Sequence, residues 1–491
     1  MGSGGQAGTG TAAGGTGGTS VGGGFAGEGG CPPGELHEPD GSCLAAGIPP
    51  EMCGEGFEPD GNAGCNAILP ADDCTDAMMA IPGETACREV APCGSGTWGN
   101  IPVDATTEHV DQSYSGGGSN GSAATPWTTI AQAINAAQNG AIVAVAAGSY
   151  AENLDITKPV RLWGRCPVDV HIVSADDQVP TVLFQQGSSG SELRDIGVRS
   201  GPVGLGVSGA TGVLADRVWI YEATVHGIEV VPVLGPASLT LTRSLLDRNQ
   251  GAGMVVAASP AIVEETVIRD SLFRAGDDRS GRGIVVQHDP DTRERAELTL
   301  RRSLLDANRF EGLTVLGSNT TVESSVIRRT LVRDTDQAVG YGINAVDDFE
   351  SLSGLRSVLV VRTSVIDSNR QAGIAVSGAF ATIEHTVIRD TAANAAAESL
   401  GGRGVVAQAD TITGEPAEVT IRSSVVSGNQ AAGVFVGGAT VTVLATIVRD
   451  TLPTSVQACL LYTSPSPRDC VSNRVCRLLL EKGGGGGGGG G

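Results

Sequence analysis

The stretch from Leu239 to Gly253, LTLTRSLLDRNQGAG, decides the fold because it returns three times without a gap. The copies are LTLRRSLLDANRFEG (298–312), LVVRTSVIDSNRQAG (359–373) and VTIRSSVVSGNQAAG (419–433). The four aligned asparagines are 59, 61 and 60 residues apart: Asn249, Asn308, Asn369 and Asn429. A fixed period of this kind indicates a repeat architecture in which each unit stacks on its neighbours.

A second, weaker copy of the frame lies inside each unit and shortens the repeat. Each asparagine is followed 22 residues later by a small hydroxylated residue: Ser271, Thr330, Thr391 and Thr451. The return to the next asparagine takes 37, 39 and 38 residues, so alternate coils carry extra residues as loops. Ten positions mark successive coils: Val198, Ile220, Leu246, Ile268, Leu305, Ile327, Ile366, Ile388, Val426 and Val448. At about 4.8 Å per coil, such a stack is roughly 50 Å long.

Alternation along the repeat predicts which side chains face inward. Leu239, Leu241 and Leu246 are expected inside, where bulky residues stack on like residues of the next coil. One column is small and hydroxylated throughout and is expected to pass hydrogen bonds between coils: Ser244, Thr266, Ser303, Ser325, Ser364, Thr386, Ser424 and Thr446. The asparagine column is expected to adopt a bent or left-handed backbone at the turn. A leucine-rich repeat is the rival solenoid, but it needs a helical return, which these segments do not suggest.

A short helix and two strand-like segments precede the repeats. Apolar residues recur at helical spacing between 126 and 140, where Thr128 or Thr129 can cap the start and Gly140 can close the end. The strand-like segments that follow contain the phrases GSY and KPVRLWG. This order closely resembles the entrance of pectate-lyase-like β-helix proteins, in which a helix plugs the first coil. The resemblance implies an all-β, right-handed parallel β-helix with an N-terminal capping helix, similar to secreted bacterial repeat proteins of undefined function.

Composition divides the chain into five segments. Residues 1–30 are almost entirely Gly, Thr, Ser and Ala and predict a disordered tether. Residues 31–95 form a Cys-rich module, 96–150 a linker and N-terminal cap, and 151–458 the solenoid, truncated at its C-terminal end. Residues 459–491 contain LLYTSPSPRD and end in nine glycines, so they resemble a translated sequencing adapter and are interpreted as an artefact. Because repeats run right up to this segment, we expect the natural protein to continue and its last coil here to expose an uncapped, aggregation-prone edge.

The cysteines indicate an oxidising compartment. Three of the 11 lie in the last segment, and eight remain: Cys31, Cys43, Cys53, Cys65, Cys74, Cys87, Cys93 and Cys166. An even number crowded into the N-terminal part predicts disulfides, with the pairing left open. A zinc cluster is the alternative, but the chain has no CxxC pair and only six His. Turn aspartates in the module could ligate calcium, although a Glu anchor is missing; otherwise we expect no cofactor or metal.

Charge and the chain start bear on partners and location. The formal charge of −22 argues against nucleic acid and anionic membrane surfaces as partners. No apolar run approaches the length of a membrane span, and the start has neither the basic nor the apolar region of a signal peptide. Together with the cysteines, this predicts an extracellular or cell-surface protein whose gene start is truncated or misassigned.

The extra length of alternate coils should leave the solenoid as two stacks of loops. The first stack comprises 272–282, 331–341 and 392–403, and the second comprises 287–295, 346–355 and 408–416. Loops on a rigid scaffold often carry sites, and two such walls would enclose a cleft. In the second stack, Asp289, Asp348 and Asp410 recur six residues after a long-coil glycine, at a spacing near that of inverting glycosidases. They are weak catalytic candidates, since solvated turn aspartates explain them equally well.

Motifs of known enzymes with this fold are largely missing. Polygalacturonase-like enzymes carry Asn-Thr-Asp, paired Asp, Gly-His-Gly and Arg-Ile-Lys motifs. Only the Gly-His-Gly motif has a partial counterpart here, Val225-His226-Gly227, in which the first Gly is absent. We therefore predict a secreted or surface-displayed protein that binds or adheres to extracellular polymers, foremost polysaccharide. The alternatives are a polysaccharide lyase or glycoside hydrolase acting between the loop stacks, and a structural spacer.

Overall fold

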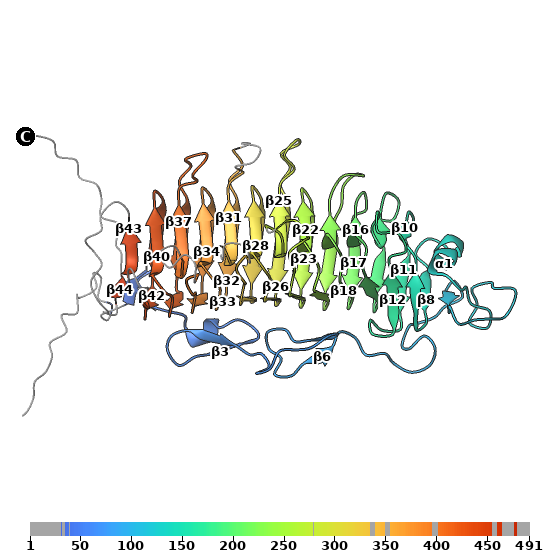
Figure 1. The fold of residues 1–491 in the computed structure, drawn as a ribbon. Helices are drawn as coiled ribbons and strands as arrows, with labels where there is room; N and C mark the ends of the chain where they lie inside the picture. Colours follow the sequence, from blue (N-terminus) through green and yellow to red (C-terminus); the bar gives the residue numbers. More distant parts are fainter. Residues whose placement is uncertain are drawn as a thin grey trace, which may run out of the picture.

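The chain winds into a stack of parallel three-sided coils (Figure 1). The computed structural model describes residues 31, 35–38, 40–277, 279–333, 339–348, 354–394, 401–453, 459–463 and 476–478. The predicted tether of residues 1–30 lies outside the described residues, as does most of the segment interpreted as an adapter. Within the described part, the fold is an all-β parallel β-helix, as the repeat predicts.

Three sheets form the sides of the solenoid, and their strands are parallel except β44, which pairs antiparallel with β42. The loop sheet has 12 strands: β10 (Leu154–Ile156), β13 (Val182–Phe184), β16 (Val203–Val207), β19 (His226–Val230), β22 (Ala252–Ala257), β25 (Arg282–Gln287), β28 (Glu311–Leu316), β31 (Tyr341–Val346), β34 (Ala372–Ser377), β37 (Arg403–Gln408), β40 (Ala432–Gly437) and β43 (Cys459–Thr463). The ladder sheet has 13: β7 (Glu108–Val110), β8 (Ile142–Val145), β11 (Arg161–Gly164), β14 (Glu192–Arg194), β17 (Val213–Asp216), β20 (Leu239–Thr242), β23 (Pro260–Glu264), β26 (Glu297–Arg301), β29 (Asn319–Glu323), β32 (Val358–Arg362), β35 (Phe380–Glu384), β38 (Glu418–Arg422) and β41 (Thr440–Leu444). The strap sheet also has 13: β9 (Gly148–Ala151), β12 (Val170–Val173), β15 (Gly197–Arg199), β18 (Trp219–Tyr221), β21 (Leu245–Asp247), β24 (Val267–Arg269), β27 (Leu304–Asp306), β30 (Val326–Arg328), β33 (Val365–Asp367), β36 (Val387–Arg389), β39 (Val425–Ser427), β42 (Thr446–Arg449) and β44 (Cys476–Leu478).

Strand register reproduces the coil frame of the sequence. Ile220 pairs with Leu246, and Leu246 pairs with Ile268, which lies 22 residues further along the chain. The same column continues through Leu305 to Val448. The solenoid begins earlier than the predicted boundary at residue 151, because β8 and β9 already provide rungs that pair with the next coil. The GSY phrase therefore belongs to the first coil.

The small hydroxylated column forms a hydrogen-bonded ladder that runs from Ser244 to Ser364 and again from Thr386 to Thr446. The backbone N–H of Thr266 donates to Ser303 Oγ (3.2 Å), and that of Ser303 donates to Ser325 Oγ (3.1 Å). Each hydroxyl in turn donates to the carbonyl two residues earlier, as Ser303 Oγ does to Arg301 O (2.7 Å). The coil-to-coil contacts thus satisfy buried polar groups at a corner where the chain leaves one sheet for the next.

The asparagine column acts through its side chains and not through its backbone, so the expectation of a left-handed Asn is wrong. The positive φ belongs to the preceding residue, for example Ala307 (52°) and Ser368 (54°). This leaves the Asn amide inside the turn. Asn369 Oδ1 accepts from the N–H of Thr330 (3.1 Å), and its Nδ2 donates to Ile327 O (3.0 Å). Each Asn therefore closes the turn of the coil before it.

A glycine column packs against the asparagines at backbone distance. A Cβ added at Gly342 would lie 2.6 Å from Gly373 O and 2.7 Å from Asn369 Nδ2. Equivalent close approaches occur at Gly283 and Gly312. Since real Cβ atoms do not approach backbone oxygen this closely, the column requires glycine for space.

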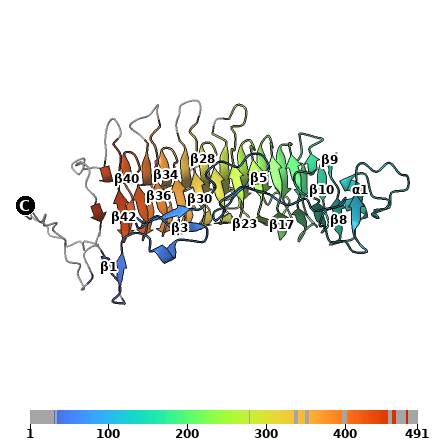
Figure 2. The same cartoon turned by 90° about the horizontal axis from the view of Figure 1, so that it is seen from below.

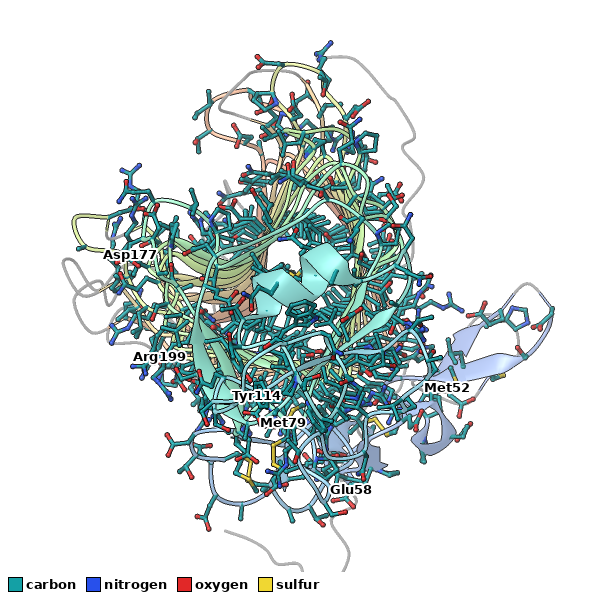
Figure 3. All side chains as sticks on the ribbon, turned by 90° about the vertical axis from the view of Figure 1, so that its right-hand side faces the viewer. Met52, Glu58, Met79, Tyr114, Asp177 and Arg199 are labelled. Carbon is teal, nitrogen blue, oxygen red and sulfur yellow. A yellow bond between two sulfur atoms is a disulfide. The ribbon has the colours of Figure 1, made fainter. Side chains whose placement is uncertain are left out.

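Helix α1 (Ile130–Ala136) lies across the open end of the first coil (Figure 3). Thr129 caps it, because its side chain accepts from the N–H of Gln132. The helix ends at Ala136, earlier than predicted, and Gly140 instead occupies a positive-φ turn beyond it. Ile130 and Ile134 are buried in the same core as the first coils.

The Cys-rich segment runs along the whole strap sheet and is not a separate module (Figure 2). We call residues 31–93 the strap; it contains β1 (Glu35–His37), β2 (Cys43–Ala45), the short 3-10 helix η1 (Pro50–Met52), β3 (Phe57–Pro59), β4 (Cys65–Ala67), β5 (Met78–Met79) and β6 (Arg88–Glu89). Gly47 N donates to Ala445 O near the last coils, and Cys93 is bridged to Cys166 near the first. The other bridges are local: Cys31–Cys43, Cys53–Cys65 and Cys74–Cys87.

The strap covers an apolar stripe on the outer face of the strap sheet. One outward row is buried beneath it: Trp219, Leu245, Val267, Leu304, Val326, Val365, Val387, Val425 and Ile447. Phe57, Met79 and Ile81 of the strap pack on this row. Arginines beside the stripe bind the strap, as Arg269 does to Asp76 O (2.6 Å) and Arg389 to Asn66 Oδ1 (2.7 Å).

Gly342→Ala should destabilise the protein by about 2–3 kcal/mol, because the new methyl group has no room against Gly373 O. Gly117→Ala is the matched control, since nothing lies within 4 Å of its added Cβ and its φ is not positive. The control should change the free energy of unfolding by no more than about 0.5 kcal/mol. Urea unfolding of both variants measures the difference; equal stabilities would contradict the proposed packing.

Val365→Asp should release the strap, because Val365 is 1% exposed on the stripe and a buried carboxylate there has no partner. Val360→Asp places the same charge on the same coil, on the outer face of the ladder sheet, and should leave the strap in place. Hydrogen exchange at the amides of β3 and β4 should accelerate in the first variant alone. Unchanged exchange there would show that the stripe does not hold the strap.

Candidate functional site

Several outward side chains of the loop sheet are buried although they point away from the core. Thr314 faces outward while its neighbours Leu313 and Val315 face inward. Glu311 also lies on the outer face, where its carboxylate accepts from the Thr314 hydroxyl. Nevertheless Glu311 is 3% exposed and Val406 is 7% exposed. Long connections extend beyond β25 and β37, as the extra residues of alternate coils predict (Figure 1).

A cavity of about 330 Å³ lies on this face, over β31, β34 and β37. We call it the sheet cavity. Its apolar lining is Val346, Ala372, Ala375, Val376 and Val406, and its polar lining is Tyr341, Asn344, Gln371, Ser377, Arg403 and Gln408. Apolar surface with a few polar groups is the usual composition of a ligand site.

Glu311 lies beside this cavity with three side-chain partners. Its carboxylate accepts from Arg282 Nε (2.9 Å), from Asn344 Nδ2 (2.7 Å) and from the hydroxyl of Thr314. These donors come from β25, β31 and β28, so the carboxylate ties three neighbouring strands together. A buried carboxylate is tolerated only with such a set of hydrogen bonds.

Two aromatic residues accompany the polar groups. Burial, with a smaller effect of the Glu311 charge, raises the pKa of Tyr341 to about 12, so the phenol keeps its proton and can donate. The Arg403 guanidinium lies over the ring of Phe435, 4.0 Å from its centre. Ring faces and guanidinium groups of this kind are suited to contact with sugars and their hydroxyls.

A second polar group gathers where β25, β31 and β37 end. His288 Nε2 lies 3.2 Å from Asp348 Oδ2, and Thr413 Oγ1 donates to Asp347 Oδ2 (2.5 Å). Burial raises the pKa of Asp347, and the carboxyl groups of Asp410 and Asp348 act in the same direction. Asp347 Oδ1 is buried without a donor, and burial of this oxygen disfavours the charged form of the carboxyl.

The three aspartates singled out from the sequence have different surroundings, and none lines the sheet cavity. Asp289 accepts from the N–H groups of Asp291 and Thr292, and hydrogen bonds of this kind lower its pKa. Asp410 closes its own loop in the same way, through Ile412 and Thr413. Asp348 is buried against His288. Loop closure thus accounts for Asp289 and Asp410 but not for Asp348, and a catalytic role of all three stays a prediction.

The residues beside the sheet cavity could have been found from the glycine column. Arg282, Glu311, Tyr341 and Arg403 each stand immediately before a column glycine. Ala252, Ala372 and Ala432 hold the same place in other coils. The available signal was that a large polar residue replaces alanine before the glycine in these coils. Residues that recur from coil to coil do not reveal such a replacement.

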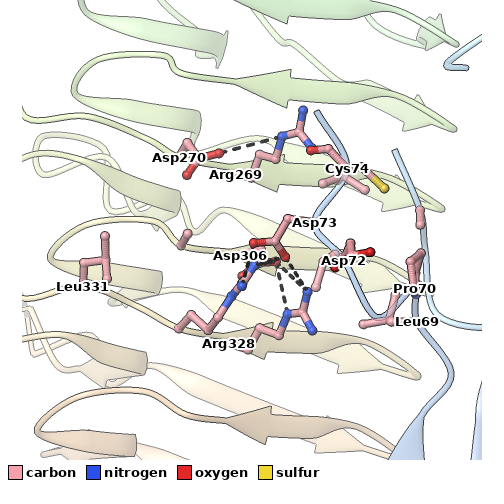
Figure 4. Close-up of a pocket in the computed structure, with 15 residues that line it drawn as sticks. Leu69, Pro70, Asp72, Asp73, Cys74, Arg269, Asp270, Asp306, Arg328 and Leu331 are labelled. Carbon is pink, nitrogen blue, oxygen red and sulfur yellow. Dashed lines mark hydrogen bonds and ion pairs between the residues drawn. The ribbon is translucent and has the colours of Figure 1, made fainter. Parts of the chain in front are cut away.

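A further cavity, of about 260 Å³, lies between the strap and the strap sheet (Figure 4). Leu304 and Val267 line its apolar part. At its rim Arg329 binds Asp306 (2.6 Å) and also Asp73 of the strap (2.7 Å). Because the Arg329 guanidinium bonds the strap and the strap sheet together, this cavity is better explained by a structural role than by ligand binding.

Metal-binding side chains give no separate site among the residues that the structure describes. The group found close together there is Cys93, Cys166 and Asp169, and its two cysteines form a disulfide. They therefore offer no thiolate to an ion. In the described part of the chain, no helix has the length and apolar character needed to span a bilayer.

Comparison with known proteins gives one family match and several solved structures. The family described as a protein of unknown function, DUF1565, matches residues 115–169, which cover α1 and the first coil. A search of the curated proteins finds no match.

The solved structures are remote in sequence. A variant catalytic domain of GH87 alpha-1,3-glucanase in complex with nigerose is 13% identical, covering 80% of this chain and 71% of its own (TM-score 0.42). The A-module of the Azotobacter vinelandii mannuronan C-5 epimerase AlgE4 is 16% identical, covering 68% and 91% (TM-score 0.42). Pectate lyase Pel9A is 13% identical, covering 72% and 81% (TM-score 0.39).

Asp347→Asn should stabilise the protein at neutral pH. Because the folded-state pKa of Asp347 is raised, the folded protein holds this proton more tightly than the unfolded chain does. Its contribution to stability is therefore largest below the unfolded pKa, near 3.8, and falls as pH rises through the folded pKa. The side-chain amide introduced by Asp347→Asn can donate a hydrogen bond toward Asp410. It does not titrate, so the loss of stability with rising pH should disappear.

Urea unfolding between pH 4 and pH 8 measures this effect. The free energy of unfolding of Asp347→Asn should rise relative to that of the wild type as pH increases. For Asp291→Asn, in the exposed loop after β25, the difference from the wild type should stay constant with pH. Parallel profiles for Asp347→Asn as well would show that folding does not raise the pKa of Asp347.

Proposed function

We propose that this protein is secreted or displayed at the cell surface and binds extracellular polysaccharide in the sheet cavity. The observation that carries the proposal is the cavity itself, an apolar floor of Ala372, Ala375 and Val406 with Tyr341 and Asn344 at its side. A sugar ring offers apolar faces and a rim of hydroxyls, which match these two kinds of surface.

The shape of the sheet favours a linear polymer over a compact ligand. Outward rows continue along the solenoid at the strand spacing of about 4.8 Å, so successive coils present equivalent positions to successive parts of a chain. Ala432 on β40 continues this row with a small residue beyond the sheet cavity, whereas Arg282 and Glu311 hold the row on the other side. A polymer lying along the axis would contact several coils at once.

The proposed location rests on the disulfides and the charge. Four disulfides in one chain are typical of proteins that fold in an oxidising compartment. The formal charge of −22 disfavours nucleic acid as the polymer.

An enzymatic role, as a lyase or glycoside hydrolase, is the second candidate. Asp347 favours it, because its raised pKa supplies the protonated carboxyl that general acid catalysis needs. Release of reducing ends or unsaturated products from acidic and neutral polysaccharides, with and without calcium, would establish turnover. Turnover that Asp347→Asn and Asp348→Asn both retain would remove these aspartates from the mechanism.

Binding in the sheet cavity is tested by Ala375→Arg, which fills the cavity floor with a long side chain. Alginate, polygalacturonate, xylan and neutral glucans are the probes, and affinity electrophoresis gives the dissociation constants. We expect at least a tenfold weaker interaction for the polymer that the wild type binds.

Thr382→Arg is the control, since it lies on the next strand of the same coil, on the outer face of the ladder sheet. It should bind as the wild type does. If no polymer binds the wild type, or if Ala375→Arg binds equally well, the proposed function is wrong.

A further inference from the structure

Glu311 fixes the orientation of the Asn344 amide. A carboxylate can only accept hydrogen bonds, so the group of Asn344 that faces it must be the NH₂, as the 2.7 Å Nδ2 contact has it. A flipped amide would place Oδ1 against the carboxylate and lose this bond. The amide of Asn344 therefore has one stable orientation.

The fixed orientation determines what Asn344 offers to a ligand. Glu311 lies on β28, on one side of β31, whereas the sheet cavity extends over β34 and β37, on the other side. The Nδ2 and Oδ1 atoms of an amide point in different directions from the same carbon. Because Nδ2 points toward β28, Oδ1 is directed toward the cavity. At this wall, Asn344 presents an acceptor.

We propose that Asn344 Oδ1 accepts a hydrogen bond from a sugar hydroxyl, and that Glu311 acts as its positioning residue, so this subsite takes a neutral sugar unit and not a uronate. The inference rests on the proposed function. A ligand carboxylate has no proton to donate to Oδ1, and the Glu311 carboxylate, which pairs with Arg282, offers it no attraction.

Neighbouring groups confine this selectivity to one subsite. Tyr341, on the same strand, keeps its phenolic proton and can complement a sugar hydroxyl as donor. Arg403 lies two coils further along the sheet, at about twice the strand spacing of 4.8 Å, and an anionic substituent of the polymer is tolerated there. The prediction therefore concerns the unit that contacts β31.

The test uses the full chain and calorimetric binding of defined hexasaccharides. The neutral probes are cellohexaose, maltohexaose and laminarihexaose, each also in permethylated form, and the acidic probe is hexagalacturonate. Permethylation keeps every oxygen as an acceptor and removes every hydroxyl donor. The wild type should bind one neutral probe at least about tenfold more tightly than its permethylated form and than hexagalacturonate.

Two variants separate contact from positioning. Asn344→Val removes the acceptor with a residue that the same row already holds at Val285 and Val406, so the fold should persist. It should weaken the neutral probe about tenfold and leave hexagalacturonate unchanged. Glu311→Gln removes the charge and lets the amide turn, which should reduce the preference for the neutral probe over hexagalacturonate at least threefold.

Glu323→Gln, on the ladder sheet, is the control and should keep the wild-type preference. If the wild type binds no saccharide of any kind, the proposed binding function itself is wrong. If it binds a saccharide but prefers the uronate, or if both variants keep the wild-type preference, the inference about Asn344 is wrong and the binding function stands.

Discussion

The fixed rise between parallel strands is the constraint on which the rest of this structure depends. Every coil must fit within the strand spacing, so the second residue of the longer loop-sheet strands is held to glycine, as Gly342 of β31 against Gly373 O shows. The amide of Asn369 then supplies the hydrogen bonds that this compressed turn cannot make with itself. Additional residues have no place inside the corner, and they must leave the coil as loops.

The same constraint explains how much of the fold the sequence predicts. Coil length, strand register and the hydroxyl ladder follow from the repeat, because residues at equal places in the frame must stack. The hydrogen-bonding role of Asn was harder to foresee, since a left-handed residue at a turn is often Asn itself. Here the left-handed position falls one residue earlier, at Ser368, which frees the Asn side chain for the turn.

The strap was not predicted, although the signal was present. Adjacent residues of a strand point to opposite faces, so the pair Leu245-Leu246 places one leucine in the core and the other outside. Two consecutive apolar residues recur in most strands of the strap sheet, which means that this face also has to be covered. The Cys-rich segment meets that need with Phe57 and Met79. Sequence spacing alone could not show this, because the partners are far apart along the chain.

The candidate site differs from the scaffold in that it breaks the repeat. Residues that recur in every long coil, such as Asp289 and Asp410, close their own loops and are explained by the geometry of a repeated turn. No other coil has a glutamate at the position of Glu311, before the column glycine. Burying a carboxylate there costs stability, which an alanine at the same position, as in other coils, would not. With one sheet covered by the strap and another carrying paired surface charges such as Arg362 and Glu384, the loop sheet is the face left for a ligand. An irregular residue on that face is therefore better evidence of a function than the most regular column of the solenoid.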